Sequence, residues 1–494
     1  MTEMSQMSQM SEMSTADAGT GQAGEKKGPD TKVVVMAIIV LLLLLFLMYS
    51  VIQASSASAD SDGEEGGGDG GDGGREGYSG GGRRRKTTTT TTTETTTEAQ
   101  ATPPPHVRPY SFVFCTVGPS VEAANKVLSV PICDFIVYTD VVVYDSKIGA
   151  YDDPISYDVF LEMAKKYQQQ LAWQGYPYPD EEEKLRQFGI SFSAHDLNYL
   201  ELSLRSVSPG DLWRTYGILT AGVASYSRGS VASDSANVNK LKSIMSSIDK
   251  MLQTARSGNT TVLKTIFLGV KLAGTTTSSQ YDAAAMNELK SIGKVDVLIL
   301  ISHLLRPELG DKCVIQPLVR YNGEAMDVAA PPAMERLIPL VDKSMPFRVA
   351  LSFTMSVFLF EPKGGLTAKT GFGDKCDLYY QLDFSEVCHV KQQVIKLSHN
   401  LSSSATAPKD KVFMVFEDVN STYAKMDEAI KEARKRDVPL VWAVYDVQND
   451  AANCKGGAKP KQPSYERFSV VRELLEKDYK EHPDKTTKPK RRRH

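Results

Sequence analysis

Short runs of β-branched and aromatic residues alternate with stretches of helical period along most of the chain after residue 107. Their apolar residues lack strict alternation, which is typical of parallel strands covered on both faces. Helix candidates such as 238–252 and 281–292 lie between them and carry apolar residues on one side. The pattern predicts an α/β fold, a (β/α)8 barrel, with a small insertion at about 357–410 before the last strand. The eight predicted strands are 111–117, 134–141, 188–193, 215–222, 265–273, 295–302, 348–356 and 438–445.

The uncharged run 33–52 predicts a membrane helix. Its twenty residues span roughly 30 Å at about 1.5 Å per residue, the thickness of a bilayer core. A cleaved signal peptide is the alternative, but its apolar core is usually only about 7–15 residues long. Three lysines precede the run within residues 26–32, whereas no Lys or Arg follows it before Arg75. Basic residues stay cytoplasmic, so we expect a single-pass type II protein of the plasma membrane with an extracellular C-terminal domain.

The segments outside the predicted domain, 107–480, differ from it in composition. Polar residues 1–32 predict a disordered cytoplasmic tail, and residues 481–494 predict a basic disordered end. Gly, Asp, Thr and Pro dominate residues 53–106, which indicates a disordered stalk. The basic cluster at 83–86 is either a protease site that would shed the domain or a solvated charge cluster. A net charge of −3 indicates neither a nucleic-acid partner nor an acidic substrate.

All six cysteines follow the apolar run, which is typical of an exported domain with three disulfides. They form no CxxC pair and are too scattered for a zinc site, so we expect no metal. No Gly-rich phosphate loop, GxSxG or HExxH motif is present, and we expect no cofactor. Three Asn-x-Ser/Thr triplets are candidate glycosylation sites: Asn259, Asn400 and Asn420.

Several segments of the domain carry patterns of one enzyme family in its order. They are FVFCTV, PICDFIVYTD, VDVLILIS, LDFSEVCHV, the stretch FMVFEDVNSTYAKMDEAIKEARKR, and VWAVYDVQNDAANC. Together they resemble glycoside hydrolase family 18, the chitinase and chitinase-like barrels, particularly divergent arthropod, tick-like members. The resemblance covers about 107–480. By position it implies disulfides Cys115–Cys133 and Cys388–Cys454, which leaves Cys313 and Cys376 for each other.

The resemblance breaks at the fourth strand, where family 18 carries its catalytic acids in the pattern DxxDxDxE. The Glu of that pattern protonates the leaving oxygen while the acetamido group of the substrate attacks. Here the stretch is RTYGILTAGVASY, and no Asp or Glu lies between Asp211 and Asp234. His303 also stands where the resemblance implies a Tyr. If Gly217 matches the first Gly of the pattern, the acidic positions are taken by Tyr216, Leu219, Ala221 and Val223.

Other residues at the strand ends are candidates for binding or for a rearranged active site. The resemblance implies that Trp442 lies under a sugar ring, although a core position is equally open, and Tyr138, Tyr226 and Tyr445 are further stacking candidates. His195 and His303 fall on the same rim, either as a metal site or general base or, the plainer interpretation, as satisfied polar residues. Four carboxylates are candidate relocated acids, with loop acids or helix caps as the plainer interpretation: Asp140, Asp196, Glu361 and Asp446.

Three functions are therefore open. The first is a membrane-anchored, catalytically inactive chitinase-like barrel that binds a glycan or an extracellular protein. The second is a glycoside hydrolase with relocated acids, which requires two of the four carboxylates to face each other across the barrel mouth. The third is a structural, mucin-like surface protein without a ligand. The first is the leading hypothesis, because a barrel frame is present without its acid.

Overall fold

The chain divides into two compact units at residue 101, and every described residue belongs to the second unit. The computed structural model describes residues 112–119, 132–173, 187–228, 234–252, 256–257, 260–261, 264–273, 279–307, 309–323, 330–384, 403–407, 411–438, 440–450 and 465–481. The predicted tail, the apolar run 33–52 and the stalk lie outside these residues. Within the described ranges, no helix combines the length and the apolar character needed to cross a bilayer.

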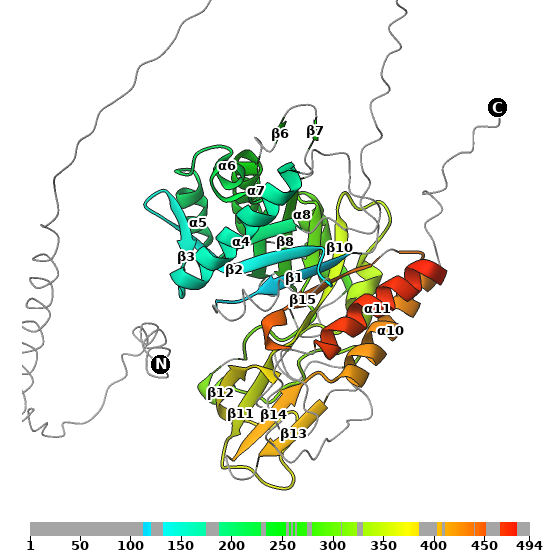
Figure 1. The fold of residues 1–494 in the computed structure, drawn as a ribbon. Coiled ribbons are helices and arrows are strands. Elements are labelled where there is room, and N and C mark those ends of the chain that lie inside the picture. Colours follow the sequence, from blue (N-terminus) through cyan, green and yellow to red (C-terminus); the bar gives the residue numbers. More distant parts are fainter. Residues whose placement is uncertain are drawn as a thin grey trace, which may run out of the picture. The chain divides into compact units, whose positions relative to one another are not determined.

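Eight parallel strands form a closed barrel, which confirms the predicted fold (Figure 1). Each strand pairs with the next in chain order, and β1 pairs with both β2 and β15, so the barrel has no free edge. The barrel strands are β1 Val113–Val117, β2 Phe135–Tyr144, β4 Gln187–Phe192, β5 Thr220–Ser227, β8 Thr265–Lys271, β9 Val297–Leu300, β10 Arg348–Thr354 and β15 Val441–Tyr445.

Helices follow the strands as in a (β/α)8 barrel, and their apolar stripes face the sheet. In α7 the buried side chains Leu241, Ile244, Met245 and Ile248 recur at helical spacing. Helix α10 begins at a capping box, in which Asp418 accepts from the Ser421 amide and Ser421 accepts from the Asp418 amide. The helices are α4 Pro154–Trp173, α5 Leu197–Leu204, α6 Asp211–Tyr216, α7 Ser235–Leu252, α8 Ser279–Lys290, α9 Met334–Leu337, α10 Val419–Lys435 and α11 Glu466–Glu481. Short 3-10 turns are η2 Gly310–Lys312, η3 Ile338–Leu340 and η5 Val447–Asn449.

The predicted fourth strand, 215–222, is wrong in its bounds. Residues 211–216 are helical, and the strand runs from Thr220 to Ser227. Gly210 and Gly217 both adopt positive φ and bound the short helix α6, since glycine takes the left-handed conformation without a steric cost. The strand therefore starts five residues later than predicted, which changes the side chains that face the barrel interior.

Two hydrophobic layers pack against opposite faces of the barrel wall. One contains only residues of the barrel strands and their immediate flanks, so it fills the interior: Phe112, Phe114, Phe135, Val137, Ala224, Phe267, Val297, Ile299, Ile301, Ala350, Val441, Ala443 and Tyr445. The other combines the alternate strand residues with residues of the helices, and it lies between wall and helices. Membership in these layers shows the direction of each strand side chain.

Strand β2 continues beyond the barrel wall into a hairpin with β3, Lys147–Ala150. The hairpin turns through Asp145 and Ser146, which both have positive φ, as the twist of a two-residue hairpin turn requires. Val143 and Ile148 are buried in the outer layer, so one face of the hairpin is fixed to the domain. The hydroxyl of Tyr199 donates to the carbonyl of Val143 over 2.9 Å and holds the hairpin against α5.

Residues 357–416 contain a separate antiparallel sheet in the order β12-β11-β14-β13, where the sequence predicts an insertion (Figure 1). Its strands are β11 Val357–Pro362, β12 Cys376–Leu382, β13 Ser403–Ala407 and β14 Val412–Phe416. A further pair, β6 Arg256–Ser257 and β7 Thr260–Thr261, forms a small hairpin. β11 follows β10 after two residues, so the insertion begins at the carboxyl end of a barrel strand.

Disulfides Cys115–Cys133 and Cys313–Cys376 are both present, as expected. The first joins β1 to the residues just before β2, and the second joins the segment after η2 to β12. Each is expected to contribute about 2–4 kcal/mol by restricting the unfolded chain. Cys388 and Cys454 lie outside the described residues, as do Asn259 and Asn400 among the predicted glycosylation sites, whereas Asn420 lies in the first turn of α10.

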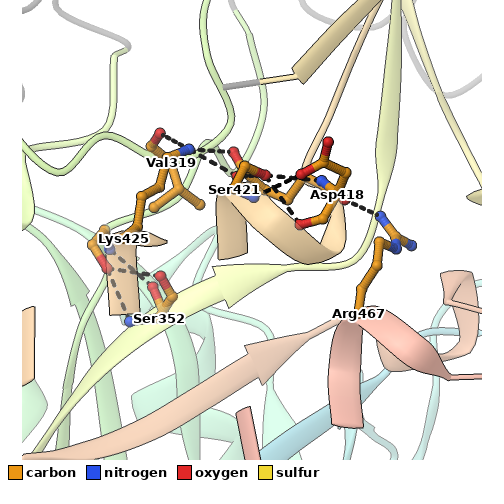
Figure 2. A network of polar contacts seen from close by, with 8 residues as sticks. Val319, Ser352, Asp418, Ser421, Lys425 and Arg467 are labelled. Atoms are coloured by element: carbon orange, nitrogen blue, oxygen red, sulfur yellow. Dashed lines mark hydrogen bonds and ion pairs between the residues drawn. The ribbon is translucent and has the colours of Figure 1, made fainter. Parts of the chain in front are cut away.

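A fully buried ion pair connects the insertion to the barrel (Figure 2). Lys425 Nζ lies 2.7 and 2.8 Å from the Glu417 oxygens and 2.8 Å from the carbonyl oxygen of Val319. Ser421 also donates to Glu417, over 2.8 Å. Nearby, Arg467 of α11 donates to the carbonyl of Glu417 and to that of Met355 after β10. Burial raises the pKa of Glu417 and lowers that of Lys425, because each charge has left water.

Breaking this pair on one side is expected to destabilise the domain strongly. Lys425→Met leaves the Glu417 charge buried without its cation, and we expect a loss of about 3–5 kcal/mol in the free energy of unfolding. Lys431→Met is the matched control, because Lys431 pairs with exposed acids on the same helix and should change stability by less than about 1 kcal/mol. Urea unfolding of both variants measures the difference. Equal stability of the two would contradict the role given to the buried pair.

Candidate binding site at the barrel mouth

The interior face of β5, the fourth barrel strand, carries no acid. Ala224 belongs to the interior layer, whereas Ala221 and Val223 belong to the outer layer. The predicted register is therefore wrong by one residue, since side chains alternate between the two faces of a strand. Tyr216 ends α6 and Leu219 precedes the strand, so these two also lie away from the expected catalytic positions. The strand TAGVASYS contains no carboxylate in either register.

Gly222 of β5 and Gly269 of β8 allow the backbones of these two neighbouring strands to approach each other closely. A Cβ atom on Gly222 would lie 2.0 Å from the carbonyl oxygen of Phe267. A Cβ atom on Gly269 would lie 1.9 Å from the carbonyl oxygen of Ala224. Both distances are far below contact, and the atoms in the way are backbone atoms. Neither position can therefore carry a side chain without a shift of the barrel wall.

Tyr445 occupies the space that these small residues leave. Its hydroxyl crosses the interior from the end of β15 and donates to the carbonyl of Ala224 over 2.5 Å. The ring lies 4.4 Å from the His303 ring, centroid to centroid. Burial raises the pKa of Tyr445 above its ordinary value, so the phenol stays protonated at any physiological pH. The centre of the barrel is filled by a neutral hydrogen-bond donor.

His303 is equally unable to ionise near neutral pH. It is buried, and its Nδ1 lies 2.7 Å from the hydroxyl oxygen of Ser352. Burial lowers the pKa of His303 to about 3, with a smaller contribution from Lys271. Ser352 and Ser302 exchange further hydrogen bonds, in which the Ser302 amide donates to the Ser352 hydroxyl and the Ser352 amide to the Ser302 hydroxyl. His303 is a satisfied core residue in this network, not a general base.

Above this filled centre, five polar side chains form a cluster at the carboxyl ends of the strands, here called the rim cluster: Thr354, Ser356, Gln381, Asp446 and Asn449. The Asp446 Oδ2 atom accepts from Thr354 over 3.1 Å, from Ser356 over 3.0 Å and from Gln381 over 3.2 Å. Gln381 and Asn449 both donate to the Ser356 hydroxyl, over 2.7 and 3.0 Å. The cluster therefore joins two barrel strands to β12 of the insertion.

Asp446 and Asp140 are the two predicted acids that come together at the mouth. Burial raises the pKa of Asp446, and the Asp140 carboxylate raises it further, whereas Arg306 opposes the change. Burial also raises the pKa of Asp140, against Arg306 and His195. Asp140 has a φ of 59°, which marks the point where β2 leaves the barrel and enters the hairpin. A polar surface with carboxylates, amides, hydroxyls and one guanidinium is thus available at the mouth.

The other two predicted acids, Asp196 and Glu361, lie away from the rim cluster and have structural roles. Asp196 caps α5 and accepts from the amides of Asn198 and Tyr199. Glu361 lies on β11 of the insertion, where its carboxylate raises the pKa of Tyr380, after burial as the larger cause. The helix-cap interpretation is therefore correct for Asp196. Neither residue joins the group at Asp446.

The predicted stacking aromatics, including Tyr445, are buried. This corrects the stacking expectation and, for Trp442, agrees with the core alternative. Trp442 is fully buried in the outer layer against Phe353, because the register of β15 turns it away from the interior. Tyr138 lies in the same layer and hydrogen-bonds Ser156, with burial raising its pKa to about 12. Tyr226 is buried there too, and its hydroxyl donates to Asp234. None of the three can lie flat on a ligand.

Sequence reasoning missed Ser356, Gln381 and Asn449 as site residues. Of these, only Asn449 lies in a family-like stretch, VWAVYDVQNDAANC. Gln381 reaches the mouth from an insertion strand 65 residues before Asp446, so no local spacing indicates it. The mouth also offers no metal site. Within the described ranges, no three His, Cys, Asp or Glu side chains are arranged to hold a metal ion. The arrangement can donate and accept hydrogen bonds, but its centre holds no carboxylic acid.

The depressed pKa of His303 predicts an acid-labile barrel. Because the folded pKa of about 3 lies below the ordinary 6.5, protonation favours the unfolded chain. Stability is then complete above pH 6.5 and falls toward pH 3 by about 1.4 kcal/mol per pH unit from this residue. We expect His303→Asn, which can still hydrogen-bond Ser352, to flatten the pH dependence of the unfolding free energy. A His303→Asn profile parallel to the wild type would contradict the assignment.

Comparison with known proteins agrees with this architecture. No protein-family model and no curated protein matches the sequence. Solved structures do match, and they are chitinases and chitinase-like proteins. YKL-39, crystallised in the presence of chitooligosaccharides, superposes with a TM-score of 0.53 at 12% identity, over 74% of this chain and 99% of that one. A second structure, of human YKL-39, gives a TM-score of 0.50 at 11% identity over 74% and 100%. That protein is described as a pseudo-chitinase with retained chitooligosaccharide-binding properties.

At these identities the likeness speaks for the fold alone. The strand pairing by itself gives a closed ring of eight parallel strands, with an antiparallel insertion after the seventh strand. The described domain of this chain therefore has the (β/α)8 barrel fold of chitinases and chitinase-like proteins.

Proposed function

We propose that this domain binds an oligosaccharide at the barrel mouth without cleaving it. The observation that carries the proposal is the filled centre, where Tyr445 donates to the backbone of β5 at the level of Ala224. Glycoside hydrolysis needs a proton donor beside the scissile bond. The groups at this centre are a phenol with a raised pKa and a neutral imidazole, and β5 supplies no acid.

The rim cluster supports the binding half of the proposal. Sugar hydroxyls both donate and accept, so they pair well with amides, hydroxyls and a carboxylate held in a fixed network. Gln381 is exposed, and Asp446 and Asn449 are half-buried, so these side chains are accessible from solvent. A solved neighbour with the same fold is described as retaining chitooligosaccharide binding as a pseudo-chitinase. We take an N-acetylglucosamine oligomer as the first ligand to test.

A glycoside hydrolase with relocated acids is the second candidate. One observation favours it, namely that the Asp140 carboxylate raises the pKa of Asp446 at the mouth. A catalytic acid must hold its proton at working pH, and two nearby carboxylates promote this. Against it, Asp446 Oδ2 already accepts three hydrogen bonds, which favour the ionised form. We therefore rank binding above hydrolysis.

Display at a membrane is a separate proposal that depends on sequence alone. The run 33–52 and its lysine asymmetry support a type II anchor at the plasma membrane with an extracellular barrel, and glycosylation would follow from that location. An arthropod, tick-like origin is likewise a proposal that depends on the sequence alone. An extracellular protein ligand, or a structural role without any ligand, remains the alternative to glycan binding.

Calorimetric titration of the full chain with a chitin hexamer tests the proposal. Gln381→Ala removes two donors from the rim cluster, and we expect the affinity to fall about 3- to 10-fold. Glu361→Gln, a neutral change on the insertion away from Asp446, should leave the affinity unchanged. Chromatography of the ligand after long incubation should show intact hexamer.

Release of shorter oligomers that stops in Asp446→Asn would favour the relocated-acid hydrolase. If titration of the wild type with the chitin hexamer gives no heat of binding, the proposal that the domain binds this glycan is wrong. In that case a glycan array and a pull-down that are both empty would favour the structural alternative.

A further inference from the structure

The β2–β3 hairpin has one free face, which carries exposed tyrosines beside the barrel mouth. Tyr144 and Tyr151 are 78% and 69% exposed, the largest exposed fractions among the large hydrophobic side chains of the described residues. Pairing across the hairpin sets Tyr144 opposite Lys147 and Val142 opposite Gly149. The next pair is Asp140 and Tyr151, whose backbones are joined by a hydrogen bond of 3.3 Å.

The opposite face of the hairpin is closed, so the tyrosines cannot turn inward. Val141, Val143 and Ile148 alternate with the free-face residues and are buried in the outer layer. Alternation in a strand sends Val142 and Tyr144 to the other side, and Tyr151 follows directly after the last pair of the hairpin, Val141 and Ala150. Tyr199 fixes the hairpin at Val143, and Ser156 joins Tyr138 of β2 to α4. The free face is therefore a rigid platform and not a loose loop.

The middle of this platform carries no side chain at Gly149. A Cβ atom on Gly149 would have no neighbour within 4 Å, so the backbone lies open at this position. Tyr144 stands on one side of this gap along the ribbon and Tyr151 on the other, about 13 Å apart, as four residues at about 3.3 Å each require. A flat ring can lie on the ribbon at Gly149 between the two tyrosines. Tyrosine suits such a role, because it offers an apolar face and a polar tip at a low entropy cost.

The platform is also continuous with the rim cluster. Asp140 is the last residue of the platform row toward the barrel. The hydroxyl of Thr139 just before it donates to the carbonyl of Val117 on β1, and the Asp446 amide of the rim cluster donates to the hydroxyl of Thr116 on the same strand. A linear ligand that leaves the mouth past Asp140 therefore meets Tyr151 and then Tyr144.

The size of the platform decides between a glycan and a protein partner. A ribbon two strands wide and four residues long presents about 13 Å by 10 Å. That area is far below the roughly 800 Å² that each partner buries in a stable protein interface. Lys147 and Asp140 give the face mixed charge, which suits a neutral ligand. A short run of sugar rings matches both the area and the alternation of aromatic and polar groups.

We propose that the free face of the β2–β3 hairpin is an extended subsite, on which Tyr144 and Tyr151 stack against sugar rings of a neutral linear oligosaccharide held at the mouth. This inference rests on the proposed function, because the platform adds length to that site. It explains why two large aromatic side chains stay exposed on a rigid ribbon. It also assigns the hairpin a specificity role, the preference for long ligands over short ones.

Titration with a chitin dimer and a chitin hexamer separates the mouth from the platform. In the full chain with Tyr144→Ala and Tyr151→Ala, we expect hexamer affinity to fall about tenfold, since stacking and apolar area are lost at two rings. Dimer affinity should stay unchanged. Tyr144→Phe with Tyr151→Phe keeps the rings and should retain most of the hexamer affinity. Tyr423→Ala, at a half-exposed tyrosine on α10, is the matched control and should bind both ligands like the wild type.

Gly149→Val provides an independent test by adding bulk instead of removing it. Valine suits a strand and the position is open, so the melting temperature should stay at the wild-type value. A side chain between the tyrosines would hold a sugar ring off the ribbon, and hexamer affinity should fall while dimer affinity does not.

The outcomes distinguish this inference from the proposed function. Equal hexamer affinity of the wild type and the double alanine variant would overturn the platform and leave binding at the mouth intact. No binding of either oligomer to the wild type would overturn both. A change of oligomeric state in the double alanine variant, seen by sedimentation, would identify the ribbon as a contact between copies of this chain and overturn the glycan assignment.

Discussion

An eight-stranded barrel must fill its own interior with side chains, and this constraint governs both the stability and the chemistry of the domain. The wall is closed by β1, which hydrogen-bonds to β2 on one side and to β15 on the other. Inside, Phe114 packs against Phe135 and Phe267. At the upper level β5 offers only Gly222 and Ala224, and the space is taken by Tyr445 from the opposite wall. The absence of an acid on β5 and the filling of the centre by Tyr445 thus belong to one packing arrangement.

The same closure separates two polar regions with different properties. Below the mouth, His303, Ser302 and Ser352 satisfy one another and are shielded from water. At the rim, Asp446 ties β10, β15 and the insertion together while its neighbours Gln381 and Asn449 stay accessible. The first region behaves as core, and the second has the character of a recognition surface. The insertion is therefore part of the site, because β12 supplies one of its side chains.

The sequence predicted the architecture well and the site poorly, for a physical reason. Apolar runs indicated all eight barrel strands, since burial on both faces leaves a strong compositional signal. The direction of each strand side chain is harder to predict, because a shift of one residue along the strand turns every side chain to the opposite face. The predicted strand 215–222 begins five residues too early, and Ala221 and Val223, which the family pattern puts at acidic positions, face the helices. The signal available in the sequence was Gly217, because a glycine often ends a helix in the left-handed conformation, as Gly217 does here.

The aromatic candidates failed for the same reason. Trp442 and Tyr138 both face the helices, so neither stacks on a ligand, and for Trp442 the core alternative holds. Tyr144 and Tyr151, the most exposed of the described tyrosines, belong to a hairpin that no barrel pattern predicts. Alternation with the buried Val141 and Val143 was the signal that could have found Tyr144. Gln381 could not be found in this way, because only the folded insertion brings it to Asp446.

The contact at Gly222 also has an evolutionary consequence. An inward acid cannot arise at that position by a single codon change, since even the first atom of a new side chain would collide with the peptide of the adjacent strand. The two strands would first have to move apart, and that would break the packing that makes the domain fold. Substitution can therefore change the exposed rim of this barrel far more readily than it can place an acid at its centre.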